Sequence, residues 1–310
     1  MRVAVTGANG FIGRAVLRAG QSAGLSMRAL VRTGMPASSS VDEHWIGEIG
    51  PDTEWSGALS GVDAVVHLAG AAHTATDAYE RVNTEGTLRL GRCAVEAGVR
   101  RLVFVSSIAV YPAGSGTNET IDTDTRPAPS TPYGGSKWRA EQGLWEIASA
   151  TGMEVVVVRP ALVVGPGAPG NLRRLAALVA RGLPLPVPST ANARSYVSLE
   201  SLADLLLIAA RHPAAAGNSF LAADATTPST RQVIQWIGEG MGRPARVVPV
   251  PDGVLSLASR LVGQSEVYRK LYGNLCVDAG RTRDQLDWSP GVSLEAAFRS
   301  LGAGFHREQC

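Results

Sequence analysis

The feature that most constrains the fold is the glycine-rich stretch TGANGFIG at residues 6–13, directly after the apolar run RVAV. Gly7, Gly10 and Gly13 stand in GxxGxxG spacing. In a strand–turn–helix these positions allow a tight turn, close approach of a pyrophosphate and close packing of the helix on the strand. The helix N-terminus then attracts the phosphates. The stretch predicts dinucleotide binding, and the alternative is a tight turn without a ligand. The expected contacts are Gly7, Asn9, Gly10, Phe11, Ile12 and Gly13.

Short β-rich runs alternate with helix-like stretches over the first half of the chain. This alternation is typical of a parallel sheet covered on both faces, so the predicted fold class is α/β, a Rossmann-like doubly wound sheet. The predicted strands are Arg2 to Thr6, Met27 to Val31, His44 to Ile46, Ala64 to Leu68, Arg101 to Ser106 and Glu154 to Val158. The clearest helices are Gly10 to Gly20, Ala78 to Ala97 and Pro132 to Ala150.

The pattern changes after Arg159-Pro160, where prolines and glycines interrupt the alternation. A smaller, mostly helical C-terminal substrate lobe is therefore expected. Residues 1–165 are assigned to the dinucleotide-binding domain, and residues 195–222 read as a strand, a helix and a strand that return to it. The segments 166–194 and 223–310 make up the substrate-binding lobe.

Charge and apolar patterning exclude several classes of partner. With 29 Lys+Arg against 27 Asp+Glu, the chain has no basic excess for nucleic acid or for an acidic membrane surface. Its longest apolar runs are far shorter than the roughly 20 residues that a bilayer requires. Its three scattered cysteines fit neither a disulfide framework nor a zinc cluster, so no metal is expected. With no secretory leader at the N-terminus, a cytoplasmic enzyme is expected.

The stretch PYGGSK places Tyr133 and Lys137 four residues apart, after Pro132 at a predicted first helical position. The two side chains then share one helix face. An ammonium near a phenol lowers the pKa of the phenol, as a proton donor or acceptor near neutral pH requires. The alternative is a solvated helix surface.

The residue after the second predicted strand is Arg32. An acidic residue there would bind the free 2′-hydroxyl of NAD, whereas an arginine offers a cation for the 2′-phosphate of NADP. NADP(H) is therefore favoured and NAD(H) is the alternative. Arg32 can also stack on the adenine or point to solvent.

Together with TGxxGxxG and YxxxK, other segments make the chain resemble the extended short-chain dehydrogenase/reductases, in the NAD-dependent epimerase/dehydratase branch that modifies nucleotide sugars. The segments that resemble this family are DAVVHLAGAA (63–72), VNTEGT (82–87), VFVSSIAVYP (103–112) and RPALVVGPG (159–167). They occur in the family's order and cover nearly the whole chain.

The resemblance implies roles for individual residues. Ser107 would hydrogen-bond the reacting oxygen, with Ser106 as the nearest competitor for this position. Tyr133 would exchange the proton, and Lys137 would lower the tyrosine pKa and bind the nicotinamide ribose. Asn83 either holds the active-site helix or is a structural asparagine. Further cofactor contacts are expected at Leu68, Ala69, Gly70 and Pro160.

In this family the second lobe binds a nucleoside diphosphate sugar, here a UDP-sugar. Asn171 at a helix start and Arg194 in ANARSYVSLE resemble the residues that meet the diphosphate, and Arg194 alternatively forms a surface ion pair. His73 either touches the sugar or the nicotinamide or is bonded locally. His67 and Cys93 are read as packing residues.

The resemblance leaves three functions open. The first is an NADPH-dependent 4-keto reductase of a UDP-sugar in surface-polysaccharide synthesis. The second is a UDP-hexose or UDP-N-acetylhexosamine 4-epimerase with tightly bound NAD, and the third is a non-catalytic nucleotide sensor. A dehydratase is disfavoured because Ile108 and Ala109 stand where that branch carries an acidic pair. Helices 78–97 and 132–150 resemble the pair that forms family homodimers.

Overall fold

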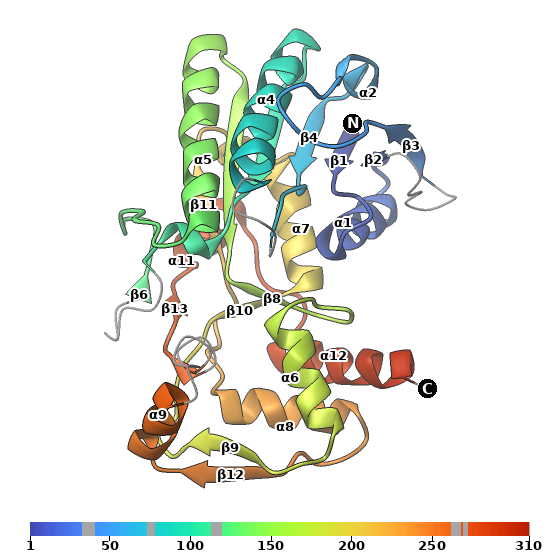
Figure 1. The fold of residues 1–310 in the computed structure, drawn as a ribbon. Helices are drawn as coiled ribbons and strands as arrows, with labels where there is room; N and C mark the ends of the chain where they lie inside the picture. The colour runs from blue at the N-terminus through green and yellow to red at the C-terminus, as the bar shows by residue number, and fades with distance from the viewer. Residues whose placement is uncertain (33–40, 73–77, 113–119, 262–267, 269–271, 310) are drawn as a thin grey trace.

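The computed structural model describes residues 1–32, 41–72, 78–112, 120–261, 268 and 272–309. Its centre is a seven-stranded sheet in the order β11-β7-β5-β4-β1-β2-β3, and each pair of neighbours is parallel (Figure 1). The strands are β1 (Arg2–Thr6), β2 (Ser26–Val31), β3 (Asp42–Trp45), β4 (Ala64–His67), β5 (Arg101–Val105), β7 (Glu154–Pro160) and β11 (Ser219–Ala222). Each of the six strands predicted in the first half lies within two residues of its predicted ends.

Helices cover both faces of this sheet. Alternate side chains of a strand point to opposite faces, so Val3 and Val5 pack against α1 (Phe11–Ser22) and α7 (Leu199–Ala209). Ala4 points the other way, into the cluster formed with α4 (Thr87–Glu96) and α5 (Pro132–Thr151). The predicted doubly wound α/β fold is confirmed.

The direction in which the strand order runs reverses between β1 and β4. Strands β1, β2 and β3 follow one another toward one edge of the sheet. Strands β4, β5, β7 and β11 follow one another toward the opposite edge. In open α/β sheets ligands bind at the carboxyl ends of the strands at such a point. Thr6 and His67 are register partners at these two carboxyl ends.

The helix predicted over residues 78–97 has two parts. Tyr79–Gly86 forms the π-helix η1, and Thr87–Glu96 forms α4. A π-helical turn is wider than an α-helical one and often marks a functional site. Both parts pack against α5, which begins and ends as predicted: Thr131 caps it, Pro132 opens it and Gly152 closes it in the left-handed conformation. A homodimer through these helices stays a prediction.

A second lobe lies below the sheet in Figure 1. It contains two parallel strand pairs, and α6, α8 and α12 pack in one hydrophobic cluster. Phe11 at the start of α1 packs against both this cluster and the cluster of the sheet. The lobe consists of β8 (Leu162–Val164), β9 (Leu185–Pro188), β10 (Tyr196–Ser198), β12 (Val247–Val250), α6 (Asn171–Ala180), α8 (Thr230–Gly240), α9 (Asp252–Leu261) and α12 (Leu294–Gln309).

The segment 195–222 joins the sheet only in part. α7 packs on the sheet and β11 forms its edge, whereas β10 pairs with β8 outside it. Within the segment expected to return to the first domain, α7 and β11 therefore lie on the sheet, and β10 pairs with β8 beside it.

Short elements complete the chain: α2 (Ser56–Leu59), η2 (Ile108–Val110), β6 (Thr120–Ile121), η3 (Pro213–Ala215), β13 (Cys276–Val277) and α11 (Gly280–Leu286). Among the helices that the structure describes, none combines the length and apolar character needed to cross a membrane.

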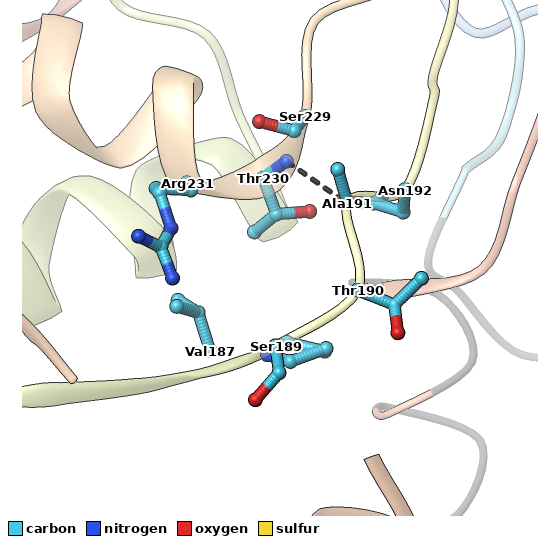
Figure 2. Close-up of a pocket in the computed structure, with 9 residues that line it drawn as sticks. Val187, Ser189, Thr190, Ala191, Asn192, Ser229, Thr230 and Arg231 are labelled. Carbon is cyan, nitrogen blue, oxygen red and sulfur yellow. Dashed lines mark hydrogen bonds between the residues drawn. The ribbon is translucent and has the colours of Figure 1, made fainter. Parts of the chain in front are cut away.

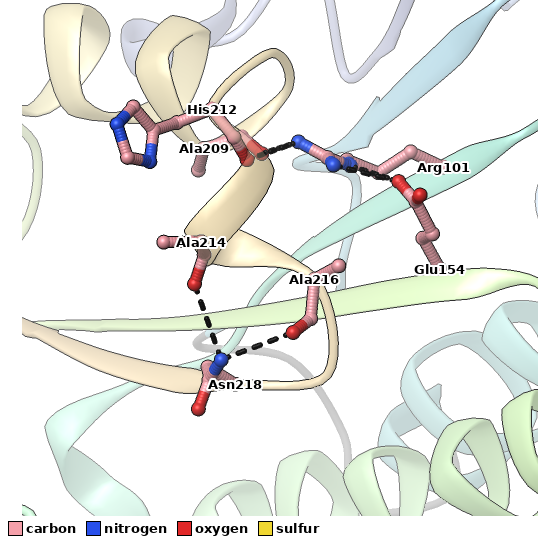
Figure 3. Close-up of polar contacts among 7 residues, drawn as sticks. All are labelled: Arg101, Glu154, Ala209, His212, Ala214, Ala216 and Asn218. Carbon is pink, nitrogen blue, oxygen red and sulfur yellow. Dashed lines mark hydrogen bonds and ion pairs between the residues drawn. The ribbon is translucent and has the colours of Figure 1, made fainter. Parts of the chain in front are cut away.

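A buried arginine fastens the amino ends of two strands to the end of α7 (Figure 3). Arg101, the first residue of β5, is 1% exposed and pairs with Glu154 of β7 at 2.6 Å. Its Nη1 donates to the carbonyl of Ala209, at the end of α7, at 3.0 Å and to the carbonyl of His212, just after α7, at 2.8 Å. Removal of the guanidinium would take these donors from both carbonyls and from Glu154, and among the described residues only the His212 carbonyl would keep a second donor, the amide of Ala215.

We expect Arg101→Met to lower the free energy of unfolding by about 2–4 kcal/mol, because it removes donors from buried acceptors while keeping most of the side-chain volume. Urea unfolding followed by circular dichroism measures this. Arg100→Met, at the exposed neighbouring position, should change it by less than about 0.5 kcal/mol. Equal effects of the two substitutions would contradict the role assigned to Arg101.

Candidate active site

The glycine turn is shaped by close backbone contacts. Gly7 has φ +64°, and a Cβ there would lie 2.9 Å from the amide nitrogen of Ala69. A Cβ on Gly13 would lie 2.2 Å from the carbonyl oxygen of Gly7. Gly10 is the N-cap of α1 and provides no capping side chain, so the first amides of α1 remain available to an anion. These residues fit a dinucleotide whose phosphates meet the start of α1.

The hydroxyl of Thr6 holds the loop that follows β4. Its oxygen accepts hydrogen bonds from the amides of Leu68 and Ala69, both at 3.1 Å, and lies 2.7 Å from Nδ1 of His67. With two amides donating to it, the hydroxyl donates its own proton to Nδ1. Nε2 then carries the ring proton and donates to Thr87 Oγ1 at 3.0 Å.

His67 is fully buried in this arrangement and stays neutral. Burial and, to a lesser degree, the charge of Lys137 lower the pKa of its ring to about 3. The sequence indicated a packing residue. The structure adds that His67 fixes the direction of the loop that follows it.

Asn83 ties the same loop to α5. Its Oδ1 accepts from the amide of Ala71 at 2.7 Å, and its Nδ2 donates to the Ala71 carbonyl at 3.1 Å and to Ser136 Oγ at 3.0 Å. A Cβ on Gly70 would lie 3.0 Å from Asn83 Oδ1 and 3.3 Å from Lys137 Nζ. Asn83 is therefore a structural asparagine, and its structural role is to hold the predicted cofactor loop against α5.

Ser107 and Tyr133 meet at the carboxyl end of β5. Ser107 is the N-cap of η2, and its oxygen accepts from the amide of Ala109 at 3.1 Å while it also hydrogen-bonds the Tyr133 side chain. A Cβ at Gly134 would lie 2.0 Å from the Ala109 carbonyl, so this glycine lets α5 approach η2 closely enough for the two hydroxyls to meet.

Ser106, the competitor for the serine role, is engaged elsewhere. It is 4% exposed, and its hydroxyl donates to the carboxylate of Glu141. The geometry therefore favours Ser107 as the residue that faces a reacting oxygen.

The pKa of Tyr133 departs from the expectation. Burial raises the pKa of the phenol, the hydrogen bond from Ser107 lowers it, and Tyr79, whose ring lies edge-on at 5.9 Å, raises it; the net direction is upward. The predicted lowering through Lys137 is therefore wrong for this structure, because the burial of the phenol dominates.

Lys137 is buried and faces the carboxyl end of β5. Its Nζ donates to the carbonyl of Val105 at 3.0 Å and lies 4.7 Å from the centre of the Phe104 ring. Burial lowers the pKa of the ammonium to about 8, and the charge of Glu141 opposes this shift. Lys137 is therefore a cation held in a nearly dry site, where it can also release its proton within an ordinary pH range.

The remaining predicted residues lie around this centre or in the second lobe. Arg32 is exposed directly after β2, and Pro160 ends β7 at the same edge of the sheet. Asn171 begins α6 as predicted. Arg194 is 8% exposed, donates to the Gly273 carbonyl at 2.7 Å and hydrogen-bonds Tyr196, so it is not a surface ion pair.

Some residues fall outside the sequence predictions or outside the described structure. His73 lies outside the described residues. Tyr79, Glu141 and Arg159 contact the site and were not singled out as site residues. Arg159 opens the segment RPALVVGPG, which resembles the family, whereas nothing in the sequence surroundings of Tyr79 and Glu141 distinguishes them from other helix positions.

A pocket of about 270 Å³ opens in the second lobe between the loop after β9 and the start of α8 (Figure 2). Asn192 Oδ1 accepts from the amide of Thr230 at 2.9 Å, and Asn192 Nδ2 is buried with no hydrogen-bond partner among the residues that the structure describes. Arg231 adds a guanidinium to the wall. The lining residues are Val187, Pro188, Ser189, Thr190, Ala191, Asn192, Ser229, Thr230 and Arg231.

Comparison with known proteins adds a family context. The model of the NAD dependent epimerase/dehydratase family matches residues 3–223. The chain is 33% identical to UDP-glucose 4-epimerase of Vibrio cholerae over 98% of this chain and 95% of that protein. The solved structure of MoeE5 in complex with UDP-glucose and NAD covers 100% of both chains with a TM-score of 0.78 at 22% identity. UDP-N-acetylglucosamine 4-epimerase from Bacillus cereus covers 99% of both chains with a TM-score of 0.80 at 18% identity.

The buried His67 predicts a pH dependence of stability. Its pKa is about 3 in the folded protein and about 6.5 in the unfolded chain, so between these values only the unfolded chain takes up the proton. The free energy of unfolding should therefore fall with decreasing pH through this window, at about 1.4 kcal/mol per pH unit from this residue.

The variant His67→Asn should lack this contribution. Urea unfolding of both proteins across the acid range should give a smaller slope of the free energy of unfolding against pH for the variant. The difference should correspond to nearly one proton taken up on unfolding. Identical slopes would show that His67 is protonated in the folded state.

Proposed function

The chain belongs to the NAD-dependent epimerase/dehydratase family of NAD(P)-dependent short-chain dehydrogenase/reductase enzymes, and we propose that it is a 4-epimerase of a UDP-hexose with one tightly held NAD. The observation that carries this proposal is the hydrogen-bonded pair Ser107 and Tyr133 beside the buried Lys137, at the sheet edge where the glycine turn opens. Similarity to UDP-glucose 4-epimerase of Vibrio cholerae along almost the whole chain supports the C4 position of a UDP-hexose.

These residues suit oxidation and re-reduction of a secondary alcohol. The glycine turn at Gly7, Gly10 and Gly13 would hold NAD, which would supply the hydride acceptor for oxidation at C4 of the sugar and the hydride donor for its re-reduction. Tyr133 takes the hydroxyl proton during the oxidation and gives it back during the reduction, while Ser107 hydrogen-bonds the oxygen in both steps. The configuration at C4 changes if the keto sugar turns its other face to the cofactor between the two steps, and no net oxidation remains.

The second lobe offers a place for the nucleotide. The pocket at the start of α8 has a size suited to a base and ribose, and Asn192 Nδ2 supplies a buried donor that no described part of the chain pairs. Arg194 lies two residues after the pocket residue Asn192 and two residues before β10. A diphosphate between the pocket and the catalytic residues would therefore pass close to Arg194. The contacts of Asn171 and Arg194 with the diphosphate are part of this proposal.

A 4-keto reductase is the second candidate, and Arg32 favours it. An exposed guanidinium directly after β2 suits the 2′-phosphate of NADP, which a reductase consumes as NADPH. The two functions share their catalytic residues and differ in cofactor and in net reaction.

Assays without added cofactor separate these functions. The purified protein should release NAD on denaturation and should interconvert UDP-glucose and UDP-galactose, or their N-acetyl forms, as followed by chromatography. If it instead oxidises NADPH in step with a UDP-4-keto-6-deoxy sugar and interconverts no hexose, the epimerase proposal is wrong. A protein active in neither assay would contradict both functions.

Tyr133→Phe should lower kcat by roughly 10²–10⁴-fold, because it removes the proton-transferring hydroxyl and leaves the ring in place. The NAD content of the purified protein should remain that of wild type. Turnover within about twofold of wild type would remove Tyr133 from the mechanism.

A further inference from the structure

Glu141 lies on the same face of α5 as the two predicted catalytic residues. Tyr133, Lys137 and Glu141 are spaced four residues apart, so they follow one another along one side of the helix. Glu141 has no exposed surface. A carboxylate buried so completely is retained only if other groups satisfy it.

The Glu141 carboxylate is bound from two strands. The hydroxyl of Ser106, at the end of β5, donates to Oε1. Arg159 of β7 donates from Nη2 to Oε2 at 2.6 Å and from Nε to both oxygens at 3.1 and 3.2 Å. Such a fork fixes the direction of the carboxylate as well as its place.

The network continues to the segment that carries the catalytic serine. Arg159 Nη1 donates to the hydroxyl of Tyr111 at 2.7 Å, directly after η2, and Tyr111 is 1% exposed. The amide of Ser106 donates to the Val158 carbonyl at 2.8 Å. Glu141 and Arg159 thus join α5, which bears Tyr133 and Lys137, to β7, which ends at Pro160, and to the segment from the end of β5 through η2, which contains Ser107.

Buried charges of both signs meet at this point. Among the described residues, the buried anion Glu141 accompanies two buried cations, Lys137 and Arg159. Glu141 raises the pKa of the Lys137 ammonium against the larger effect of burial. The titratable groups around Lys137 and Glu141 are Tyr133 on α5, neutral His67 on β4, Tyr79 on η1, Tyr111 after η2 and Arg159 on β7.

From these contacts we propose that Glu141 is a positioning residue for the catalytic centre: with Arg159 it sets α5 against the ends of β5 and β7, and its charge keeps Lys137 cationic. The inference rests on the proposed function only for its kinetic readout. The titration of Lys137 itself needs no substrate.

The sequence makes this titration accessible. Although the chain has 29 Lys+Arg, only Lys137 and Lys270 are lysines. Protein labelled with ¹³C at the lysine ε-carbon should give two lysine signals, and Lys270→Arg assigns them. In wild type the Lys137 signal should titrate near pH 8.

In Glu141→Gln the Lys137 midpoint should fall by about one pH unit or more, a tenfold change in its ionisation equilibrium. Glu141→Asp keeps the charge, so its midpoint should remain near that of wild type. Glu146→Gln, the same substitution at an exposed position of α5, should leave the midpoint and the activity unchanged. If Glu141→Gln does not fold, Glu141→Gln/Arg159→Gln serves the same test, because it buries no unpaired charge.

The kinetic readout uses the UDP-sugar that wild type converts. At pH values above the Lys137 titration midpoint of the variant, Glu141→Gln should lower kcat roughly tenfold or more. Its KM should stay within about twofold of wild type. An unchanged Lys137 midpoint in Glu141→Gln, or an equal fall in Glu141→Asp and Glu141→Gln, would overturn the proposal and leave a purely structural ion pair. Wild type inactive on every UDP-sugar would count against the proposed function, whereas the titration would still decide the role of Glu141.

Discussion

The hydroxyl of Thr6 joins the two central strands at the point on which the candidate site depends. It receives two amides of the loop after β4 and donates to His67, whose other nitrogen reaches Thr87 at the start of α4. Parallel strands that diverge at their carboxyl ends leave backbone groups unpaired there, and burial makes such groups costly. Thr6 satisfies the amides of Leu68 and Ala69, and His67 holds the Thr6 hydroxyl in place, so the start of the loop beneath the glycine turn has its backbone donors paired.

Much of this arrangement could be predicted from local sequence. The strands of the first half are short β-rich runs between glycines and polar residues, and the turn at Gly7 requires a conformation that favours glycine. Helix α5 carries its signals on the chain itself, with Thr131 as the cap, Pro132 at its first position and Gly152 at its end. Spacing of four residues placed Tyr133 and Lys137 on one face. Signals of this kind depend only on neighbours in sequence.

The remaining features depend on contacts between distant segments. Glu141 is 18 residues from Arg159 and 35 residues from Ser106 in the chain, and no periodicity of a helix or strand relates residues at these separations. The same holds for β10, whose pairing with β8 rather than β7 depends on β11 taking the open edge. The direction of the Tyr133 pKa shift also required the structure, because burial outweighs the neighbours that the sequence suggests. Sequence thus specified the candidate chemical groups, and tertiary packing specified their electrostatic environment.

Phe11 belongs to the first turn of α1, yet it packs against the hydrophobic clusters of both lobes. A dinucleotide seated at the start of that helix would thus rest on a side chain that is also part of the wall of the substrate lobe. One aromatic ring would then be shared between the cofactor end of α1 and the core of the second lobe. A change in the conformation of Phe11 would therefore alter the packing of both lobes at once.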